Sequence, residues 1–169
     1  PVFNEAENLP LLIPNLARVL NQIGRPYEMI FVDDGSSDRS RKILKGMLSQ
    51  YPSLRIIGLK ENCGLSTALL AGAKEARGEW IVTLDSDLQN DPQDIPKLMA
   101  YLDRYDMATG WRQKRRDTWL KKISSKIANF IRNWLSGEEI KDSACTLRVF
   151  KRECLDDLFA FNGMHRFLS

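Results

Sequence analysis

The sequence predicts an α/β fold in which helices cover both faces of a mostly parallel central sheet, so that the chain forms three layers. Two observations support this prediction. Strand-like apolar runs alternate three times with helix-like segments, and no two-residue hairpin turn lies between neighbouring strands. The 169 residues, 43% of them hydrophobic, fit one domain with a substantial core.

The first strand-then-helix unit follows a helix predicted over residues 6–23, where apolar side chains recur every three or four residues up to Gly24-Arg25-Pro26. Residues 27–32 are then predicted to form a buried strand. Ser37 or Asp38 can cap the next helix, which we expect to reach about residue 50.

Two further units follow in the same order. A strand is predicted over residues 54–59, a turn over 61–64 and an Ala- and Leu-rich helix over 66–77. The third unit is a strand at 80–84 with a helix at 94–104, and a short strand at 106–109 comes last.

We expect residues 1–169 to be a single domain cut from a longer protein. The chain opens without a methionine, so the first strand is expected to be incomplete, and it stops where an apolar segment starts, so a C-terminal membrane segment can be absent. No run approaches the roughly 20 apolar residues of a membrane span, and no signal peptide is visible.

The cysteine and histidine content excludes several kinds of site. Cys63, Cys145 and Cys154 are odd in number and form no C-x-x-C pair, so we interpret them as reduced packing residues in a cytoplasmic context. His165 is the single histidine, which leaves little material for a His-Asp pair or a histidine-rich metal site.

Two carboxylates one residue apart end the apolar run at 80–84. Asp85 and Asp87, followed by Gln89, share one direction if the chain stays extended, and their oxygens suit a hard divalent cation such as Mg²⁺ or Mn²⁺. An acidic surface turn is the alternative for an isolated D-x-D. The polar loops at 4–5, 33–36 and 85–87 each follow a strand, and we expect them to meet at the carboxyl edge of the sheet, where ligands bind in such folds.

Other phosphate-binding folds lack support. The chain contains neither G-x-G-x-x-G after its first strand nor G-x-x-x-x-G-K-[ST], and a receiver domain would need an acceptor aspartate where residues 58–61 read Gly-Leu-Lys-Glu.

Four stretches together resemble family 2 glycosyltransferases of the GT-A (Rossmann-like) fold, within them the polyprenyl-phosphate, or dolichol-phosphate mannosyltransferase-like, group. They are PVFNEAENL from Pro1, VDDGSSD from Val32, LDSDLQNDP from Leu84 and DSACTLRVFKR from Asp142, and they span nearly the whole chain in the order of the family.

The resemblance implies a nucleotide-sugar site and a metal site. It places Pro1, Phe3, Asn4 and Glu5 around the nucleobase and ribose. Asp34 would contact the nucleotide, and Asn62 and Gly64 form either a structural turn or a wall of the site. Asp85, Asp87 and Gln89 would form the site for Mg²⁺ or Mn²⁺ on the diphosphate, with Asp87 and Gln89 most directly on the metal and Asp85 near the ribose or the metal.

The acceptor is expected to meet the basic stretch after residue 110, where seven basic residues accompany one acidic residue over 112–126. By the resemblance, Arg112, Lys121 and Ser125 bind the acceptor phosphate, although Lys122 and Ser124 fit the pattern as well. An apolar stripe from Trp119 to Trp134 predicts either an amphipathic helix on a membrane surface or a helix facing the core. The patch is one helix long and lacks a recognised binding module, so nucleic acid is not an expected partner.

Asp87, Asp142 and Arg148 complete the predicted catalytic residues, with Asp142 near the sugar or acceptor and Arg148 near the diphosphate. The resemblance implies an inverting, metal-dependent catalytic domain that transfers a sugar from a UDP- or GDP-sugar to a polyprenyl phosphate at the cytoplasmic membrane face. It also leaves room for a homo-oligomer through missing C-terminal residues. A hydroxyl acceptor, for which Asp142 would be the base, and a nucleotide-sugar-binding module without turnover are the alternatives.

Overall fold

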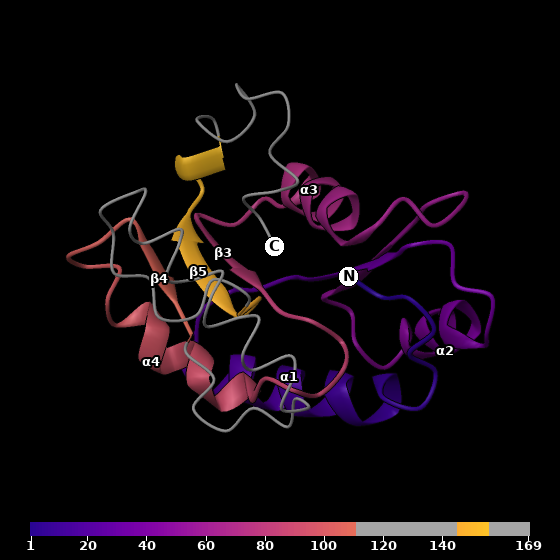
Figure 1. The fold of residues 1–169 in the computed structure, drawn as a ribbon. Coiled ribbons are helices and arrows are strands. Elements are labelled where there is room, and N and C mark those ends of the chain that lie inside the picture. Colours follow the sequence, from indigo (N-terminus) through magenta and orange to yellow (C-terminus); the bar gives the residue numbers. More distant parts are fainter. Residues whose placement is uncertain (111–144, 156–169) are drawn as a thin grey trace, which may run out of the picture.

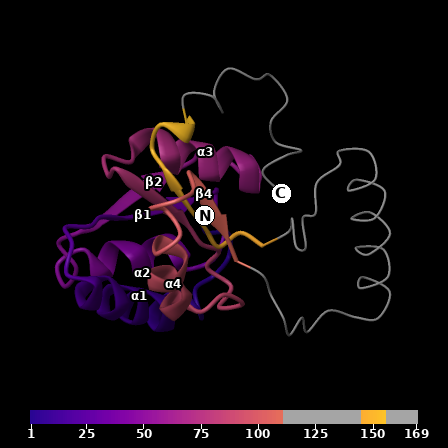
Figure 2. The same ribbon diagram turned by 90° about the vertical axis from the view of Figure 1, so that its left-hand side faces the viewer.

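A computed structural model describes residues 1–110 and 145–155 of the chain. The strands form a middle layer, with α1 (Leu9–Ile23), α2 (Ser40–Met47) and α4 (Ile95–Met99) on one face and α3 (Leu65–Glu75) on the other (Figure 1, Figure 2). The strands are β1 (Met29–Asp33), β2 (Leu54–Gly58), β3 (Trp80–Thr83), β4 (Met107–Thr109) and β5 (Arg148–Lys151). The predicted three-layer α/β arrangement is therefore confirmed.

The described strands form two sheets. In the first, β1 and β2 pair in parallel, and Val2 adds a parallel bridge to Asp33. In the second, β5 lies between β3 and β4 and is antiparallel to both. The parallel pair was predicted, whereas β5 and its antiparallel pairing were not.

Three helices, α1, α2 and α4, are clearly shorter than predicted. α2 begins at Ser40 with Arg39 at the N-cap position, so the prediction of Ser37 or Asp38 as N-cap is wrong, and it ends at Met47 instead of about residue 50. α1 begins at Leu9 instead of residue 6, because residues 6–8 form a turn; just before it, the amides of Glu5 and Ala6 donate to Ser40 Oγ and Asp38 Oδ2. α4 follows a 3₁₀ turn, η1 (Pro92–Asp94), and ends at Met99, after which the chain makes turns with bonds of the 3₁₀ type, such as Leu102 N to Met99 O.

The main core lies between α1 and the parallel strands. Leu9, Leu12 and Ile13 of α1 are buried against β1 and β2, as the predicted stripe required, and Gly24 in the left-handed conformation ends the helix. None of the three cysteines is in a disulfide. Cys145 is buried as predicted for a packing residue, but Cys63 is exposed because it lies in the turn before α3.

An ion pair joins the start of β1 to β2 and the end of α3. Arg55 Nη1 donates to Glu28 Oε2 at 2.6 Å and to the carbonyl oxygen of Glu75 at 2.9 Å, while the amide of Arg77 donates to Glu28 Oε1. Burial acts to raise the pKa of Glu28, but the hydrogen bonds from Arg77 and Arg55 outweigh burial and lower it.

Glu28→Gln should therefore destabilise the protein at neutral pH by about 1 kcal/mol. Because the pKa of Glu28 is lowered by folding, the ionised carboxylate stabilises the fold above its unfolded pKa, and this stabilisation is lost as pH falls through the folded pKa. Urea unfolding from pH 7 down to about pH 3 should show the gap between wild type and variant shrinking below about pH 4.5. Glu7→Gln, at an exposed position, is the control. If the difference in unfolding free energy between wild type and Glu28→Gln stayed constant with pH, the charge of Glu28 would not be what stabilises the fold.

Candidate active site at the carboxyl edge of the strands

The loops after Val2, β1 and β3 meet at one edge, as predicted from the sequence. The amide of Val2 donates to Val32 O and the amide of Asp34 donates to Val2 O, which sets the N-terminal segment beside β1. Ser86 Oγ, in the loop after β3, donates to the carbonyl oxygen of Pro1. Residues far apart in sequence thus share one edge, where parallel α/β folds place their ligands.

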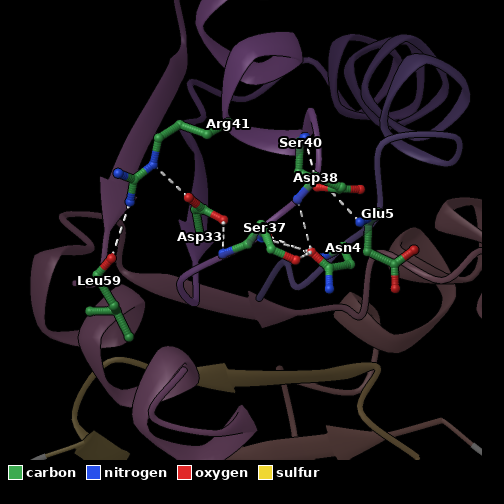
Figure 3. A network of polar contacts seen from close by, with 9 residues as sticks. Asn4, Glu5, Asp33, Ser37, Asp38, Ser40, Arg41 and Leu59 are labelled. Carbon is green, nitrogen blue, oxygen red and sulfur yellow. Dashed lines mark hydrogen bonds and ion pairs between the residues drawn. The ribbon is translucent and has the colours of Figure 1, made fainter. Parts of the chain in front are cut away.

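Asn4 fastens the N-terminal loop to the loop after β1 (Figure 3). It adopts a positive φ of 57°, and its amide donates to Ser36 Oγ at 3.0 Å. Its Oδ1 accepts from the amides of Ser37 and Asp38 at 2.9 and 3.2 Å. Burial acts to raise the pKa of Asp38, but hydrogen bonds from Ser40 and from the amide of Ala6 outweigh it and lower the pKa. Asn4 therefore shapes the predicted nucleotide site through the backbone of the neighbouring loop.

Asp33 is a residue whose role the sequence did not reveal. Its side chain is 0% exposed and pairs with Arg41 Nε at 2.7 Å, while the amide of Ser36 donates to its other oxygen (Figure 3). Arg41 also donates to the carbonyl oxygen of Leu59, in the segment that follows β2. A buried carboxylate beside an arginine is the usual way to hold loops in a fixed position. The Asp-Asp pair was visible in the sequence, but which aspartate faces inward depends on the strand register.

Asp34, predicted to contact the nucleotide, holds the turn before α3. It is 3% exposed, and its two oxygens accept from the amides of Cys63 and Gly64 at 2.7 and 2.9 Å. Gly64, which has a φ of 89°, thereby lies beside Asp34 in the turn before α3, and the role of Asn62 and Gly64 as a wall of the site stays a prediction. Phe3 is 46% exposed and Glu5 half-buried, so both are accessible to a ligand at this edge.

The carboxylate of Asp85 accepts a hydrogen bond from Thr146, two residues before β5. Thr146 Oγ1 donates to Asp85 Oδ2 at 2.7 Å, and Asn90 Nδ2 donates to the same hydroxyl at 3.3 Å. The hydroxyl of Thr83, at the end of β3, donates to the carbonyl oxygen of Thr146 at 2.6 Å. Thr146 and Asn90 are buried, so this hydrogen-bond network holds the Asp85 carboxylate from the protein interior. Neither residue was predicted, although both lie within the stretches that carry the family resemblance.

Asp87 and Gln89 are oriented by a bend instead of a strand. β3 ends at Thr83, residues 86–88 bend, and Leu88 has a φ of 60°. The expectation that an extended chain aligns Asp85, Asp87 and Gln89 is therefore wrong, because the alternation of side chains holds only within a strand. Instead, Asp87 Oδ1 accepts from the amide of Gln89 at 3.0 Å, and Asp87 is half-buried beside the exposed Gln89.

The donor set of this turn is compatible with Mg²⁺ or Mn²⁺. No group of three or more His, Cys, Asp or Glu side chains that could hold a metal occurs in residues 1–110 and 145–155. Mg²⁺ commonly binds through one or two carboxylates, keeps several waters and takes phosphate oxygens from its substrate. The carboxylates of Asp85 and Asp87 with the amide oxygen of Gln89 match that chemistry, so these residues would hold the cation together with a diphosphate.

Arg148 lies at the same edge. As the first residue of β5 it is level with Thr83 of β3 and Thr109 of β4, and its Nε donates to the carbonyl oxygen of Cys145 at 3.2 Å. Its predicted place near a diphosphate stays a prediction. The remaining predicted residues, Arg112, Lys121, Ser125 and Asp142, and the stripe from Trp119 to Trp134, lie outside the described residues.

The layers, the strand-edge loops and the acidic turn define the class of the protein: an α/β domain of the GT-A type. The chain belongs to glycosyl transferase family 2, since the model of that family matches residues 1–159.

Among curated proteins, the chain is 41% identical over 155 residues to the undecaprenyl-phosphate 4-deoxy-4-formamido-L-arabinose transferase of Pectobacterium carotovorum subsp. carotovorum (strain PC1). The match covers 90% of this chain and 47% of that protein. The transferase of the same name from Proteus mirabilis (strain HI4320) is 36% identical, with 99% and 52% covered. The chain thus spans about half the length of these relatives. The resemblance to a polyprenyl-phosphate group of the family is confirmed.

Solved structures with this fold include glucosyl-3-phosphoglycerate synthase from Mycobacterium tuberculosis in complex with phosphoglyceric acid, with a TM-score of 0.71 and 19% identity over 92% of this chain and 56% of that one. S. aureus TarS in complex with UDP superimposes with a TM-score of 0.61 and 19% identity over 95% of this chain and 48% of that one. At these identities the likeness establishes the fold. In the described part of this chain, no helix is both long and apolar enough to cross a membrane.

Proposed function

We propose that this chain is the donor-binding catalytic part of an inverting glycosyltransferase that moves a sugar from a nucleoside-diphosphate sugar to a polyprenyl phosphate. The observation that carries the proposal is an acidic turn, Asp85 to Gln89, fixed at the ligand-binding edge in a chain 41% identical to an undecaprenyl-phosphate transferase. UDP is the first nucleotide to test, because TarS, which has this fold, was crystallised with UDP and with UDP-GlcNAc.

The proposed reaction is a single displacement at the anomeric carbon. An acceptor phosphate oxygen forms the new bond to that carbon, and the bond to the diphosphate oxygen breaks, so the nucleoside diphosphate leaves with the electron pair. A phosphate acceptor is already ionised near neutral pH and needs no general base. The protein's task is then to hold two anions together and to neutralise their charge. Asp85, Asp87 and Gln89 would hold Mg²⁺ or Mn²⁺, which supplies charge neutralisation on the leaving diphosphate when bound.

Transfer should be measured with UDP- and GDP-sugars, with and without Mn²⁺, using undecaprenyl phosphate in detergent as acceptor and following both the lipid product and the released nucleotide. The proposal also places the reaction at the cytoplasmic face of the membrane, where a lipid acceptor can meet a nucleotide sugar. Donor binding without hydrolysis or transfer would favour a module without turnover, and transfer only to glycans would favour the hydroxyl-acceptor alternative.

The Lys121→Ala variant tests binding of the acceptor separately from binding of the donor. If Lys121, which lies outside the described residues, binds the acceptor phosphate, the variant should keep its donor affinity while transfer to the lipid falls about tenfold, the loss expected for one charge-assisted contact. Lys97→Ala is the control, because Lys97 pairs on the surface of α4 with Asp94. Equal loss of donor binding would contradict an acceptor role for Lys121.

Thr146→Val tests the support of Asp85. Valine keeps the shape of the side chain but removes the hydroxyl that donates to Asp85, so Mn²⁺-dependent donor affinity should fall by about 1–2 kcal/mol, roughly tenfold. Thr146→Ser keeps the hydroxyl and should retain most of the affinity. Isothermal titration with UDP-sugar, alongside urea unfolding, distinguishes the loss of binding from a loss of stability. If valine and serine bind alike, Thr146 does not position the carboxylate.

A further inference from the structure

Leu88, in the acidic turn, adopts a backbone conformation that is unusual for leucine. Its φ is 60°, and among the non-glycine residues that the structure describes only Asn4 shares a positive φ. The side chain of Asn4 bonds locally in this conformation, since its Oδ1 accepts from the amides of Ser37 and Asp38. A leucine side chain forms no hydrogen bond, so the strain at Leu88 has no such compensation.

The acidic turn is anchored on both sides of Leu88. Ser86 and Asn90 are 4% and 8% exposed, and the side chains of both form hydrogen bonds within the protein. Between these two anchors the chain comes to the surface, where Leu88 is 40% exposed. Its neighbours in sequence are Asp87 and Gln89, both proposed ligands of the cation. An apolar side chain is thus exposed within the segment that would hold the cation.

Neither core packing nor backbone geometry explains a leucine at this position. Leu88 belongs to none of the three apolar clusters formed by the described residues. A glycine would reach the same φ without strain and would still allow the amide of Gln89 to donate to Asp87. What the leucine adds over a glycine is exposed apolar surface beside the proposed cation site.

Of the groups that the proposed reaction brings to this turn, only the lipid is a hydrocarbon. The diphosphate and the cation are charged, and the sugar carries hydroxyl groups. In the displacement, the acceptor phosphate alone separates the first isoprene unit of the polyprenyl chain from the anomeric carbon. Contact between that unit and an apolar side chain beside the cation site would remove the apolar surface of both from water.

We propose that Leu88 contacts the first isoprene unit of the polyprenyl phosphate and thereby favours an isoprenoid acceptor over a polar one. The inference rests on the proposed function, because it needs a lipid phosphate at this site. The contact strengthens acceptor binding without changing the charge around the cation. Its loss should therefore raise the KM for the acceptor and leave both kcat and donor affinity close to those of the wild type.

Three substitutions separate the apolar side chain from the shape of the turn. Leu88→Asn keeps a similar size and suits the left-handed conformation but removes the apolar surface. Leu88→Gly removes the side chain together with the strain, and Leu88→Met keeps an apolar side chain. The KM for undecaprenyl phosphate should rise about tenfold in the Asn and Gly variants and change less than about twofold in the Met variant.

Two binding measurements give the same comparison without turnover. Isothermal titration of UDP in the presence of Mn²⁺ should give wild-type affinity for Leu88→Asn. Titration of geranyl phosphate onto the chain already loaded with Mn²⁺ and UDP should show the loss, whereas inorganic phosphate, which has no hydrocarbon, should bind wild type and variant alike. Leu48→Asn is the matched control, because Leu48 is 42% exposed at the C-cap of α2, outside the candidate site.

The outcomes distinguish this inference from the proposed function. If the wild type forms no lipid product from undecaprenyl phosphate, the proposed function fails and the inference fails with it. If the wild type transfers and Leu88→Asn keeps both its KM and its affinity for geranyl phosphate, the inference alone is overturned. An equal loss of UDP affinity in Leu88→Asn would also overturn it, because Leu88 would then act on the donor side. A similar rise in KM for Leu48→Asn would show that the effect is not specific to the turn and would overturn it as well.

Discussion

Replacing Asp87 with alanine is expected to abolish metal-dependent binding of the donor diphosphate and to lower transfer by a factor of about 10² to 10³. Asp87 stands in the bend after β3, half-buried, with one oxygen accepting from the amide of Gln89. In the proposed site, the Asp87 carboxylate would help to hold the cation, which would neutralise charge on the diphosphate. Removing it therefore weakens the interaction on which the departure of the nucleoside diphosphate depends.

Three measurements identify the cause of that loss. Asp87→Asn keeps an oxygen for the amide of Gln89 but loses the charge, so it should bind donor as poorly as Asp87→Ala if the charge matters and normally if only the bend matters. Asp91→Ala, four residues later at an exposed position where it caps Gln93, should leave donor binding intact. Titrating UDP with and without Mn²⁺ provides the readout. An Asp87→Ala variant whose donor affinity keeps its dependence on metal would show that the cation lies elsewhere.

The Gly35→Ala variant is expected to lose about 3–4 kcal/mol of unfolding free energy, which lowers the melting temperature by roughly 10 °C. Gly35 has a φ of +69°, a conformation that costs a residue with a Cβ. A Cβ here would also lie 2.5 Å from the carbonyl carbon of Glu61 and 2.7 Å from the amide nitrogen of Asn62. Both neighbours are backbone atoms and cannot rotate away, so the loops after β1 and β2 would have to separate.

Two other glycines separate the cost of backbone strain from the cost of the steric clash. Gly24 has nearly the same φ, +72°, but no atom lies within 4 Å of the position that a Cβ would take, so Gly24→Ala should cost only about 1 kcal/mol of strain. Gly46 lies within α2 with equally open space around it, and its replacement by alanine should stabilise by about 0.5–1 kcal/mol. Thermal unfolding of the three variants is the measurement. If Gly35→Ala costs no more than Gly24→Ala, the two loops do not approach as closely as described.

Much of the fold was predictable because its signals are local. The stripe of Leu9, Leu12 and Ile13 predicted the buried face of α1, and the apolar run before Asp33 predicted β1. Helix ends were less predictable, because the backbone groups of the first and last turns take partners outside the helix. The amides of Glu5 and Ala6, just before α1, bond to side chains more than thirty positions away, and the sequence does not show such contacts.

The candidate site was likewise predictable where its signals are local and unpredictable where distant residues meet. The loops that meet at the carboxyl edge follow from strand order, which the sequence pattern predicts. The orientation of individual side chains does not: the Thr146 hydroxyl reaches Asp85 because β5 pairs with β3, and that pairing of distant segments cannot be read from a local pattern. The two hydrogen bonds that Asp34 accepts from the amides of Cys63 and Gly64 could not be predicted either, because they join loops about thirty residues apart.

The central position of β5 determines the order in which the chain can fold. α1, β1, α2 and β2 are consecutive and share a core, so they can assemble while the ribosome is still adding later residues. In the described residues, β3 and β4 have hydrogen-bonded ladders only to β5, whose residues are made some forty positions after β4 ends. Pairing across so large a sequence separation is slow, and until it forms, the edges of β3 and β4 stay exposed to other chains. Thr146 arrives with β5, so the support of Asp85 is completed in this last step, and an incompletely folded chain lacks it.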